Sequence, residues 1–171
     1  TYDGLVADSP DSEPPDPRCS EDDPLTIFYS NGTTGDPKGI VLSHYARAMY
    51  CTLYASAWRM TPESVSLHTG SLVFNGSLMT LLPSFFLGGT YILHREFRPA
   101  DVIETIARER VTHMVMVPSQ IVALLNYPGL DAEKLSSLQA LISLGEILHV
   151  AHKERLCALL PDRFYEMYGL A

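Results

Sequence analysis

Short apolar segments alternate with amphipathic ones along most of this sequence, and this alternation limits the folds open to it. From Leu25 onward, runs rich in Val, Ile, Leu and aromatic residues are separated by longer helical patterns. Such repeats favour a mainly parallel β-sheet, because the chain needs a crossover helix to reach the next parallel strand. We therefore predict an α/β fold with helices on both faces of the sheet.

Individual elements follow from local patterns. Residues 25–30 and 38–44 are strand-like and flank a glycine-rich loop, which predicts a hairpin. Further strands are predicted at residues 64–73, 90–94, 112–117, 138–145 and 163–170, with residues 90–94 as a short buried strand. Helices are predicted at residues 44–60, 76–89, 98–111, 118–127 and 149–160, with Ser43 as an N-cap and Gly88–Gly89 as a stop.

The first 24 residues differ in composition from the rest. They hold eight acids and one base, whereas the remaining chain holds 12 acids and 11 bases. Proline, serine and acid in this proportion favour an extended, solvated connector, so we predict a linker at 1–24 and one α/β subdomain at 25–171, incomplete at both ends. An acidic docking tail is the alternative for residues 1–24.

Charge and cysteine content exclude several protein classes. The nearly neutral remainder has no basic surface of the kind that nucleic acid binding requires. Cys19, Cys51 and Cys157 form no CxxC motif or plausible disulfide framework, which favours a reducing, cytoplasmic setting. The longest uncharged stretch, residues 65–94, is broken by Pro83 and paired glycines, so we predict no transmembrane segment.

Ligands of parallel α/β sheets bind where strands end at their carboxyl edge. The loops after Tyr29, Val73, Val117, Leu144 and Tyr168 are therefore the expected positions of the functional residues.

The loop in the first hairpin, FYSNGTTGDPKGIVLSH, has the composition of a phosphate cradle. It combines hydroxyl groups, glycines that let backbone N–H groups approach an anion, and one lysine. A Walker loop starting at Gly32 would need glycine in place of Pro37 and a hydroxyl in place of Gly39, and no GxGxxG pattern is present. A plain hairpin turn is the remaining alternative, but such a turn has no use for so many glycines and hydroxyls.

YSNGTTGDPKG resembles the phosphate-binding signature of the adenylate-forming superfamily, [YF]TSGTTGxPKG, with Asn31 in place of serine. The resemblance continues in order and spacing through LSH, SLVFNGSLMTLLPSFFLGGT, VPSQIVALL, SLGEIL and FYEMYGLA, and so covers residues 25–171. It implies an AMP-forming acid–thiol ligase, or acyl-CoA synthetase. In such an enzyme a carboxylate attacks the α-phosphate of ATP to give an acyl-adenylate, and CoA then takes the acyl group.

The resemblance also implies roles for individual residues. The phosphates of ATP would be held by Ser30, Asn31, Gly32, Thr33, Thr34, Gly35 and Lys38. The adenine and AMP site would include Gly145, Glu146, Glu166, Met167, Tyr168, Gly169 and Ala171, with Tyr168 stacked on the base. The acyl pocket would include Phe74, Asn75, Ser77, Met79 and Leu170.

Some of these assignments compete with a structural role. Tyr168, Phe74 and Met79 could instead be core residues. Asn75 replaces the histidine of an aromatic–His pair common in the family, and His68, seven residues earlier, cannot take its place by register. Ala171 replaces a threonine whose hydroxyl contacts the α-phosphate.

The metal and the missing parts of the family pattern are expected outside these residues. Magnesium would be bound by a glutamate directly after Ala171, and the catalytic lysine would lie in a C-terminal domain. We therefore expect residues 1–171 alone to bind ATP weakly and to form no adenylate. His149 and His152 are spaced for a metal, but no ligand cluster completes a site.

The expected partners are small molecules: a carboxylate, ATP and CoA, with the remaining domains of the same protein. Apolar surroundings in the pocket segment favour a fatty or aryl acid, because no aspartate is present there to bind an α-ammonium group. Two other functions stay open at this point: a non-catalytic nucleotide-binding module, and the adenylation domain of a peptide synthetase, whose acceptor is a carrier thiol.

Overall fold

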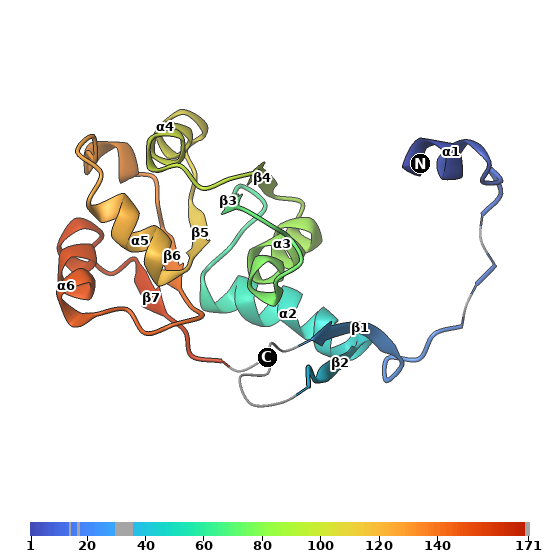
Figure 1. The fold of residues 1–171 in the computed structure, drawn as a ribbon. Helices are drawn as coiled ribbons and strands as arrows, with labels where there is room; N and C mark the ends of the chain where they lie inside the picture. The colour runs from blue at the N-terminus through green and yellow to red at the C-terminus, as the bar shows by residue number, and fades with distance from the viewer. Residues whose placement is uncertain (14, 17, 30–35, 170–171) are drawn as a thin grey trace.

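The computed structural model describes residues 1–13, 15–16, 18–29 and 36–169, and its elements follow the predicted order (Figure 1). The strands are β1 (Pro24–Tyr29), β2 (Gly39–Ser43), β3 (Val65–Thr69), β4 (Thr90–His94), β5 (His113–Met116), β6 (Ala140–Ser143) and β7 (Phe164–Glu166). The helices are α1 (Tyr2–Ala7), α2 (His44–Ala57), α3 (Asn75–Leu87), α4 (Pro99–Glu109), α5 (Pro118–Leu125) and α6 (Val150–Leu159), with a 3-10 turn, η1 (Glu133–Leu135).

Five strands form a parallel sheet in the order β4-β3-β5-β6-β7, which confirms the predicted fold class. Every residue of β5 and β6 is buried, because these strands lie inside the sheet and helices cover both of its faces. The sheet edges are β4 and β7.

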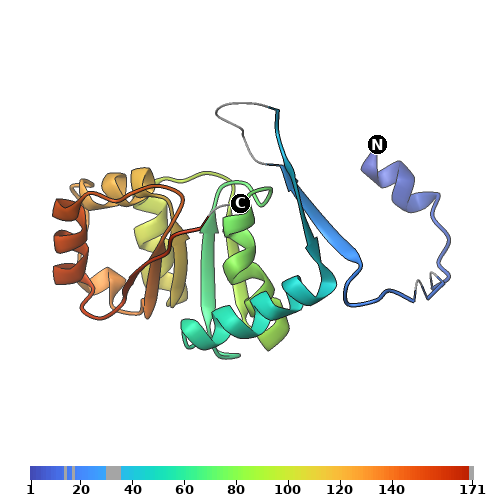
Figure 2. The same ribbon diagram turned by 90° about the horizontal axis from the view of Figure 1, so that it is seen from below.

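Side chains alternate between two apolar clusters, one on each face of the sheet. On one face, Met114 and Leu141 pack in a cluster that α4, α5 and α6 also supply. On the other face, Val115 and Ile142 pack with residues of α2 and α3. Figure 2 shows these two groups of helices on opposite sides of the strands. The amphipathic pattern predicted for residues 98–111 therefore faces the larger cluster.

The prediction of a buried strand at residues 90–94 is wrong in one respect. β4 is an edge strand, and Leu93 keeps 47% of its surface exposed. An apolar run does not reveal its position in the sheet, because the order of strands depends on contacts between distant segments.

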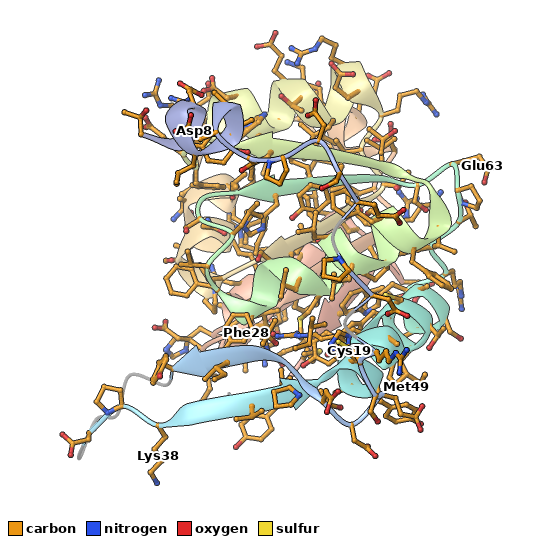
Figure 3. The ribbon with its side chains drawn as sticks, turned by 90° about the vertical axis from the view of Figure 1, so that its right-hand side faces the viewer. Asp8, Cys19, Phe28, Lys38, Met49 and Glu63 are labelled. Carbon is orange, nitrogen blue, oxygen red and sulfur yellow. The ribbon has the colours of Figure 1, made fainter. Side chains whose placement is uncertain are left out.

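β1 and β2 pair antiparallel, as predicted, and stand beside the five-stranded sheet. Thr26 and Phe28 of β1 are partly buried toward the body of the molecule, whereas Lys38 extends away from it (Figure 3). Ser43 ends β2 and caps α2, since its hydroxyl accepts a hydrogen bond from the backbone N–H of Ala46 at 3.3 Å.

The N-terminal segment has one feature that composition did not predict. α1 forms from residues 2–7, has no buried residue and lies away from the sheet (Figure 1). The end of this segment docks on α2, because the carbonyl oxygens of Glu21 and Asp23 accept hydrogen bonds from the backbone N–H groups of Tyr45 and His44. The division into a linker at 1–24 and a subdomain at 25–171 stays a prediction.

His113 should make the stability of the fold depend on pH. Its side chain is 0% exposed, and Nε2 donates to the carbonyl oxygen of Trp58 at 2.9 Å. Burial lowers the pKa of His113 below its ordinary value of 6.5. As the pH falls through about 6.5, the unfolded chain therefore takes up this proton more readily than the folded chain, and the free energy of unfolding falls.

We expect His113→Gln to weaken this dependence, because glutamine does not titrate and its amide can still donate to the Trp58 carbonyl oxygen. Denaturant unfolding of the protein between about pH 7 and pH 5 measures the slope. The exposed His149, changed to Gln, serves as the control and should keep the wild-type slope. A His113→Gln slope equal to that of the wild type would contradict the prediction.

Candidate functional site

The loops at the carboxyl edge of the sheet contain two cavities, and most of the described candidate residues line one or the other. The first, the β6–β7 cavity, has a volume of about 440 Å³. Its lining residues are Gly145, Glu146, Ile147, Lys153, Glu166, Met167, Tyr168 and Gly169. All the described residues predicted for an adenine site therefore come together here, although they come from two separate segments of the chain, after β6 and at the end of β7.

Tyr168 presents its ring to this cavity and not to the core, since 88% of its surface is exposed. The alternative of a core aromatic at a strand end is therefore wrong. Met167, beside it, packs against the cluster that contains Val115 and Ile142. Met167 is thus held against the core, while the ring of the next residue, Tyr168, is exposed.

Two residues of the β6–β7 cavity, Ile147 and Lys153, were not predicted from the sequence. The Lys153 Nζ atom lies 2.6 Å from Oε2 of Glu166, so an ion pair joins α6 to the end of β7 across the cavity. No motif marked Lys153. It reaches the cavity because α6 runs back along the sheet beside β7.

The second cavity, the β3–β5 cavity, has a volume of about 380 Å³ and borders the first at Gly145. Its lining residues are His68, Thr69, Gly70, Ser71, Phe74, Gly76, Ser77, Val115, Met116, Val117, Gln120, Leu144 and Gly145. None of these described lining residues is acidic. The backbone of Gly145, with φ of 97°, has the left-handed conformation that glycine adopts without strain.

The predicted acyl-pocket residues divide between this cavity and other positions. Phe74 and Ser77 line it. Met79 is 5% exposed and belongs to the core cluster under α2 and α3, so it does not line the cavity. Asn75 is not among the residues that line the cavity, and its side-chain oxygen accepts a hydrogen bond from Arg47. Leu170 lies outside the described residues, as does Ala171 of the adenine set.

Two polar side chains of the β3–β5 cavity were not predicted to lie there. His68, set aside on register, has Nε2 at 3.3 Å from the carbonyl oxygen of Ser71, and burial lowers its pKa. A carbonyl only accepts hydrogen bonds, so Nε2 carries the proton of the neutral ring. Gln120 donates from Nε2 to the Thr69 hydroxyl at 3.2 Å. Both groups are therefore held in defined orientations at the wall of an otherwise largely apolar cavity.

The predicted phosphate-binding residues 30–35 lie outside the described residues. Lys38, the last member of that set, is described and exposed just before β2. The glycine-rich loop follows residue 29, the last residue of β1, and it ends at residue 36, three residues before β2 begins.

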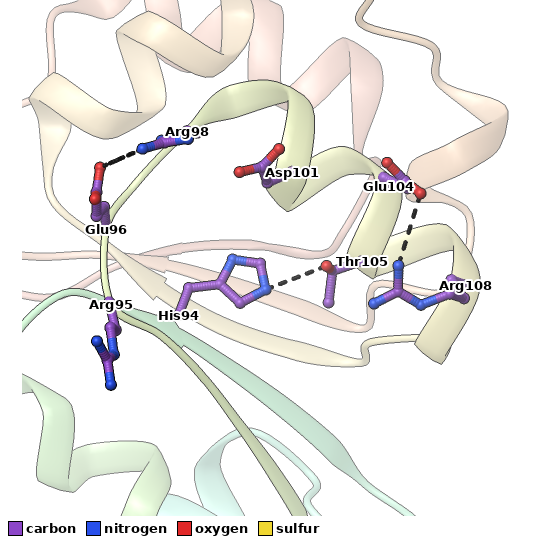
Figure 4. A pocket seen from close by; sticks show the side chains of 8 residues that line it. All are labelled: His94, Arg95, Glu96, Arg98, Asp101, Glu104, Thr105 and Arg108. Atoms are coloured by element: carbon purple, nitrogen blue, oxygen red, sulfur yellow. Dashed lines mark hydrogen bonds and ion pairs between the residues drawn. The ribbon is translucent and has the colours of Figure 1, made fainter.

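A third cavity, of about 340 Å³, lies between the end of β4 and α4 (Figure 4). Its lining contains as many acidic as basic side chains, and two ion pairs form among them: Arg98 with Glu96 at 3.0 Å, and Arg108 with Glu104 at 3.7 Å. The His94 ring meets the Thr105 hydroxyl at 3.2 Å. Because these charges compensate one another and no candidate residue lies here, we assign this cavity no role.

Residues 1–13, 15–16, 18–29 and 36–169 contain no group of three or more His, Cys, Asp or Glu side chains that could hold a metal ion. Within the same residues, no helix is both long and apolar enough to cross a membrane.

Known proteins similar to this chain include two CoA ligases. The feruloyl-CoA synthase of an Amycolatopsis species is 34% identical over 139 residues, covering 81% of this chain and 28% of that protein. The indoleacetate–CoA ligase of Aromatoleum aromaticum is 33% identical over 152 residues, with the same coverage of 81% and 28%. The chain thus spans 28% of the length of each of these relatives.

Among solved structures, the ATP-bound MatB from Rhodopseudomonas palustris superposes with a TM-score of 0.81 at 28% identity. The superposition covers 89% of this chain and 30% of that protein. A comparison with known protein families matches residues 2–171 to one described as AMP-binding enzyme. The match spans both cavities and the hairpin, and this chain belongs to the AMP-binding enzyme family.

Proposed function

We propose that the full-length protein containing this chain is an AMP-forming acid–thiol ligase. It activates an aryl or fatty carboxylate with ATP and transfers the acyl group to CoA. The observation that carries the proposal is the meeting of two cavities at Gly145 on the carboxyl edge of the sheet. One cavity has an exposed aromatic ring suited to a base, and the other is largely apolar and suited to an acyl group.

In this proposal the β6–β7 cavity binds the adenine of ATP. The exposed ring of Tyr168 stacks on the base, and Gly145 with Glu146 forms the facing wall. Lys38 and the residues Ser30, Gly32, Thr33 and Thr34 hold the β- and γ-phosphates. These groups neutralise charge as pyrophosphate leaves, and charge neutralisation with in-line positioning is the main requirement of phosphoryl and adenylyl transfer.

The carboxylate enters through the β3–β5 cavity. One of its oxygens forms a bond to the α-phosphorus of ATP while the bond from that phosphorus to pyrophosphate breaks, which gives the acyl-adenylate. The thiol sulfur of CoA, having lost its proton, then bonds to the acyl carbon, and AMP leaves with the electron pair of the broken acyl–oxygen bond.

The lining of the β3–β5 cavity supports an aryl or fatty acid over an amino acid. Phe74, Val117 and Leu144 give it apolar walls, and no described lining residue is acidic, so none could bind an α-ammonium group. The similar proteins from Amycolatopsis and Aromatoleum are named for ferulate and indoleacetate, both aryl acids. We therefore put aryl acids first among the substrates to be tested.

Two further parts of the proposal concern magnesium and location. Magnesium would accompany ATP and shield its phosphate charge, with its protein ligand outside residues 1–171. We also infer a reducing, cytoplasmic setting, which the three free cysteines, Cys19, Cys51 and Cys157, support.

An ATP–pyrophosphate exchange assay of the full-length protein tests the proposal. The panel holds aryl acids, fatty acids and amino acids, each with and without CoA. We expect exchange with at least one aryl or fatty acid and thioester formation when CoA is added. Exchange with amino acids alone would favour a peptide-synthetase adenylation domain, and binding of ATP without exchange would favour a non-catalytic nucleotide-binding module.

Replacing Tyr168 tests the adenine assignment. We expect Tyr168→Ala to raise the KM for ATP by about tenfold, because an aromatic side chain stacked on a base contributes about 1–3 kcal/mol. Tyr168→Phe should stay near the wild-type value, since the ring face is kept. Tyr45→Ala is the matched control, because Tyr45 is also an exposed tyrosine but does not line the cavity. An unchanged KM for ATP in Tyr168→Ala would refute the stacking role.

Replacing Lys38 separates the two half-reactions. The proposed role of Lys38 is to stabilise pyrophosphate as it leaves, so Lys38→Ala should slow adenylation far more than the transfer of a preformed acyl-adenylate to CoA. Single-turnover rates of the two steps, measured separately, give the comparison. Equal losses in both steps would argue against a role at the phosphates.

A further inference from the structure

Arg47, on α2, is an unusual residue for the interior of a protein. Its side chain is 3% exposed, and it lies where α2, β1 and the start of α3 meet. Nε donates to the Thr26 hydroxyl at 3.0 Å, and Nη1 donates to Oδ1 of Asn75 at 2.8 Å. The guanidinium also lies over the rings of Phe28 and Tyr50, at 4.9 and 4.8 Å from their centroids.

In the part of the chain that the structure describes, no carboxylate pairs with this buried charge. Within residues 1–13, 15–16, 18–29 and 36–169, no ion pair involves Arg47, and its buried Nη2 atom has no hydrogen-bond partner. Burial lowers the pKa of Arg47, but an arginine stays protonated at neutral pH. A buried cation held only by neutral groups is costly for a fold, so its retention needs a reason beyond packing.

The contact with Arg47 also fixes the orientation of Asn75. A guanidinium has donors and no acceptor, so the side-chain atom of Asn75 that faces it must be the oxygen. The amide nitrogen therefore faces the other way, and in the described part of the chain it makes no hydrogen bond. Asn75 thus keeps an oriented, uncommitted donor at the first turn of α3.

Arg47 lies between the parts of the molecule proposed to bind the ATP phosphates and the acyl group. Thr26 belongs to β1, which leads directly into the glycine-rich loop. Asn75 stands between Phe74 and Gly76, and both of these neighbours line the β3–β5 cavity. Arg47 therefore links the strand that leads to the ATP phosphates with the helix that borders the acyl cavity, and the reacting groups on both sides are anions.

We propose that Arg47 is a positioning residue for adenylation: it holds Asn75 with its amide donor outward and keeps a positive charge near the anionic reactants. This inference rests on the proposed function. The neutral partner is essential to it, because aspartate has nearly the same shape as asparagine and would neutralise the guanidinium. Asparagine fixes the geometry and leaves the charge uncompensated.

Asn75→Asp separates this role from a purely structural one. The new carboxylate gives Arg47 a counter-ion, so thermal stability should be unchanged or higher. The same carboxylate cancels the positive charge and removes the amide donor. ATP–pyrophosphate exchange by the full-length protein should therefore fall by about tenfold or more, since one unit charge at short range alters a barrier by this order. A stable Asn75→Asp protein with wild-type exchange would overturn the proposal.

Asn126→Asp is the matched control. Oδ1 of Asn126 accepts a hydrogen bond from Nη1 of Arg155 at 3.0 Å, so the substitution makes the same chemical change in another arginine–asparagine pair. That pair joins the end of α5 to α6, and neither residue lines the two cavities. Exchange should stay at the wild-type rate in Asn126→Asp, and an equal loss in both variants would overturn the proposal.

Two substitutions of Arg47 keep the proposal testable if Asn75→Asp fails to fold. Arg47→Lys keeps the charge and Arg47→Met removes it with similar length, so exchange should be partly retained in the first and largely lost in the second. Equal exchange in Arg47→Met and the wild type would overturn the proposal. Failure of the proposed function looks different, because the wild-type protein itself would then show no exchange with any acid.

Discussion

The burial of β5 and β6 between two layers of helices is the constraint on which the rest of the molecule depends. All eight positions of these strands are buried, and alternate side chains enter the apolar clusters on opposite faces. Burial under helices on both faces is typical of parallel strands, and the strands of this sheet do run parallel and are joined by crossover helices. The loops that follow them therefore gather at one edge of the sheet, and both candidate cavities lie at this edge.

The second important contact lies outside the sheet. The β1–β2 hairpin carries the ends of the glycine-rich loop, yet it pairs with no strand of the five-stranded sheet. It is held against α2 and α3 partly through Arg47, which reaches Thr26 on one side and Asn75 on the other. A hydrogen-bonded cation that also faces two aromatic rings has a defined orientation. The hairpin is thereby anchored close to the cavity proposed for the acyl group.

Local patterns predicted the elements well because each pattern has a direct backbone cause. The amphipathic spacing of Val102, Ile103 and Ile106 required a helix, and the left-handed Gly88 ended another. The described adenine candidates also came together as expected, because the segments at the same edge of a parallel sheet are neighbours. Local patterns wrongly predicted a buried strand around Leu93, which is half exposed on an edge strand. They also wrongly predicted that Met79 lines the acyl pocket, whereas it lies in the core.

By itself, the sequence determined the class of fold, the positions of the loops at the functional edge and the family to which the chain belongs. Those properties depend on residue type and spacing along the chain, which are visible without coordinates. Only the tertiary structure decided which polar side chains line the same cavity and which ones bond to a buried charge. Gln120 reaches Thr69 across 51 residues of chain numbering only because β3 and β5 are neighbours, and Arg47 meets Asn75 because α2 packs on α3. Contacts of this kind depend on the order of strands in the sheet and on which helices pack together, and a local sequence pattern contains no information about either.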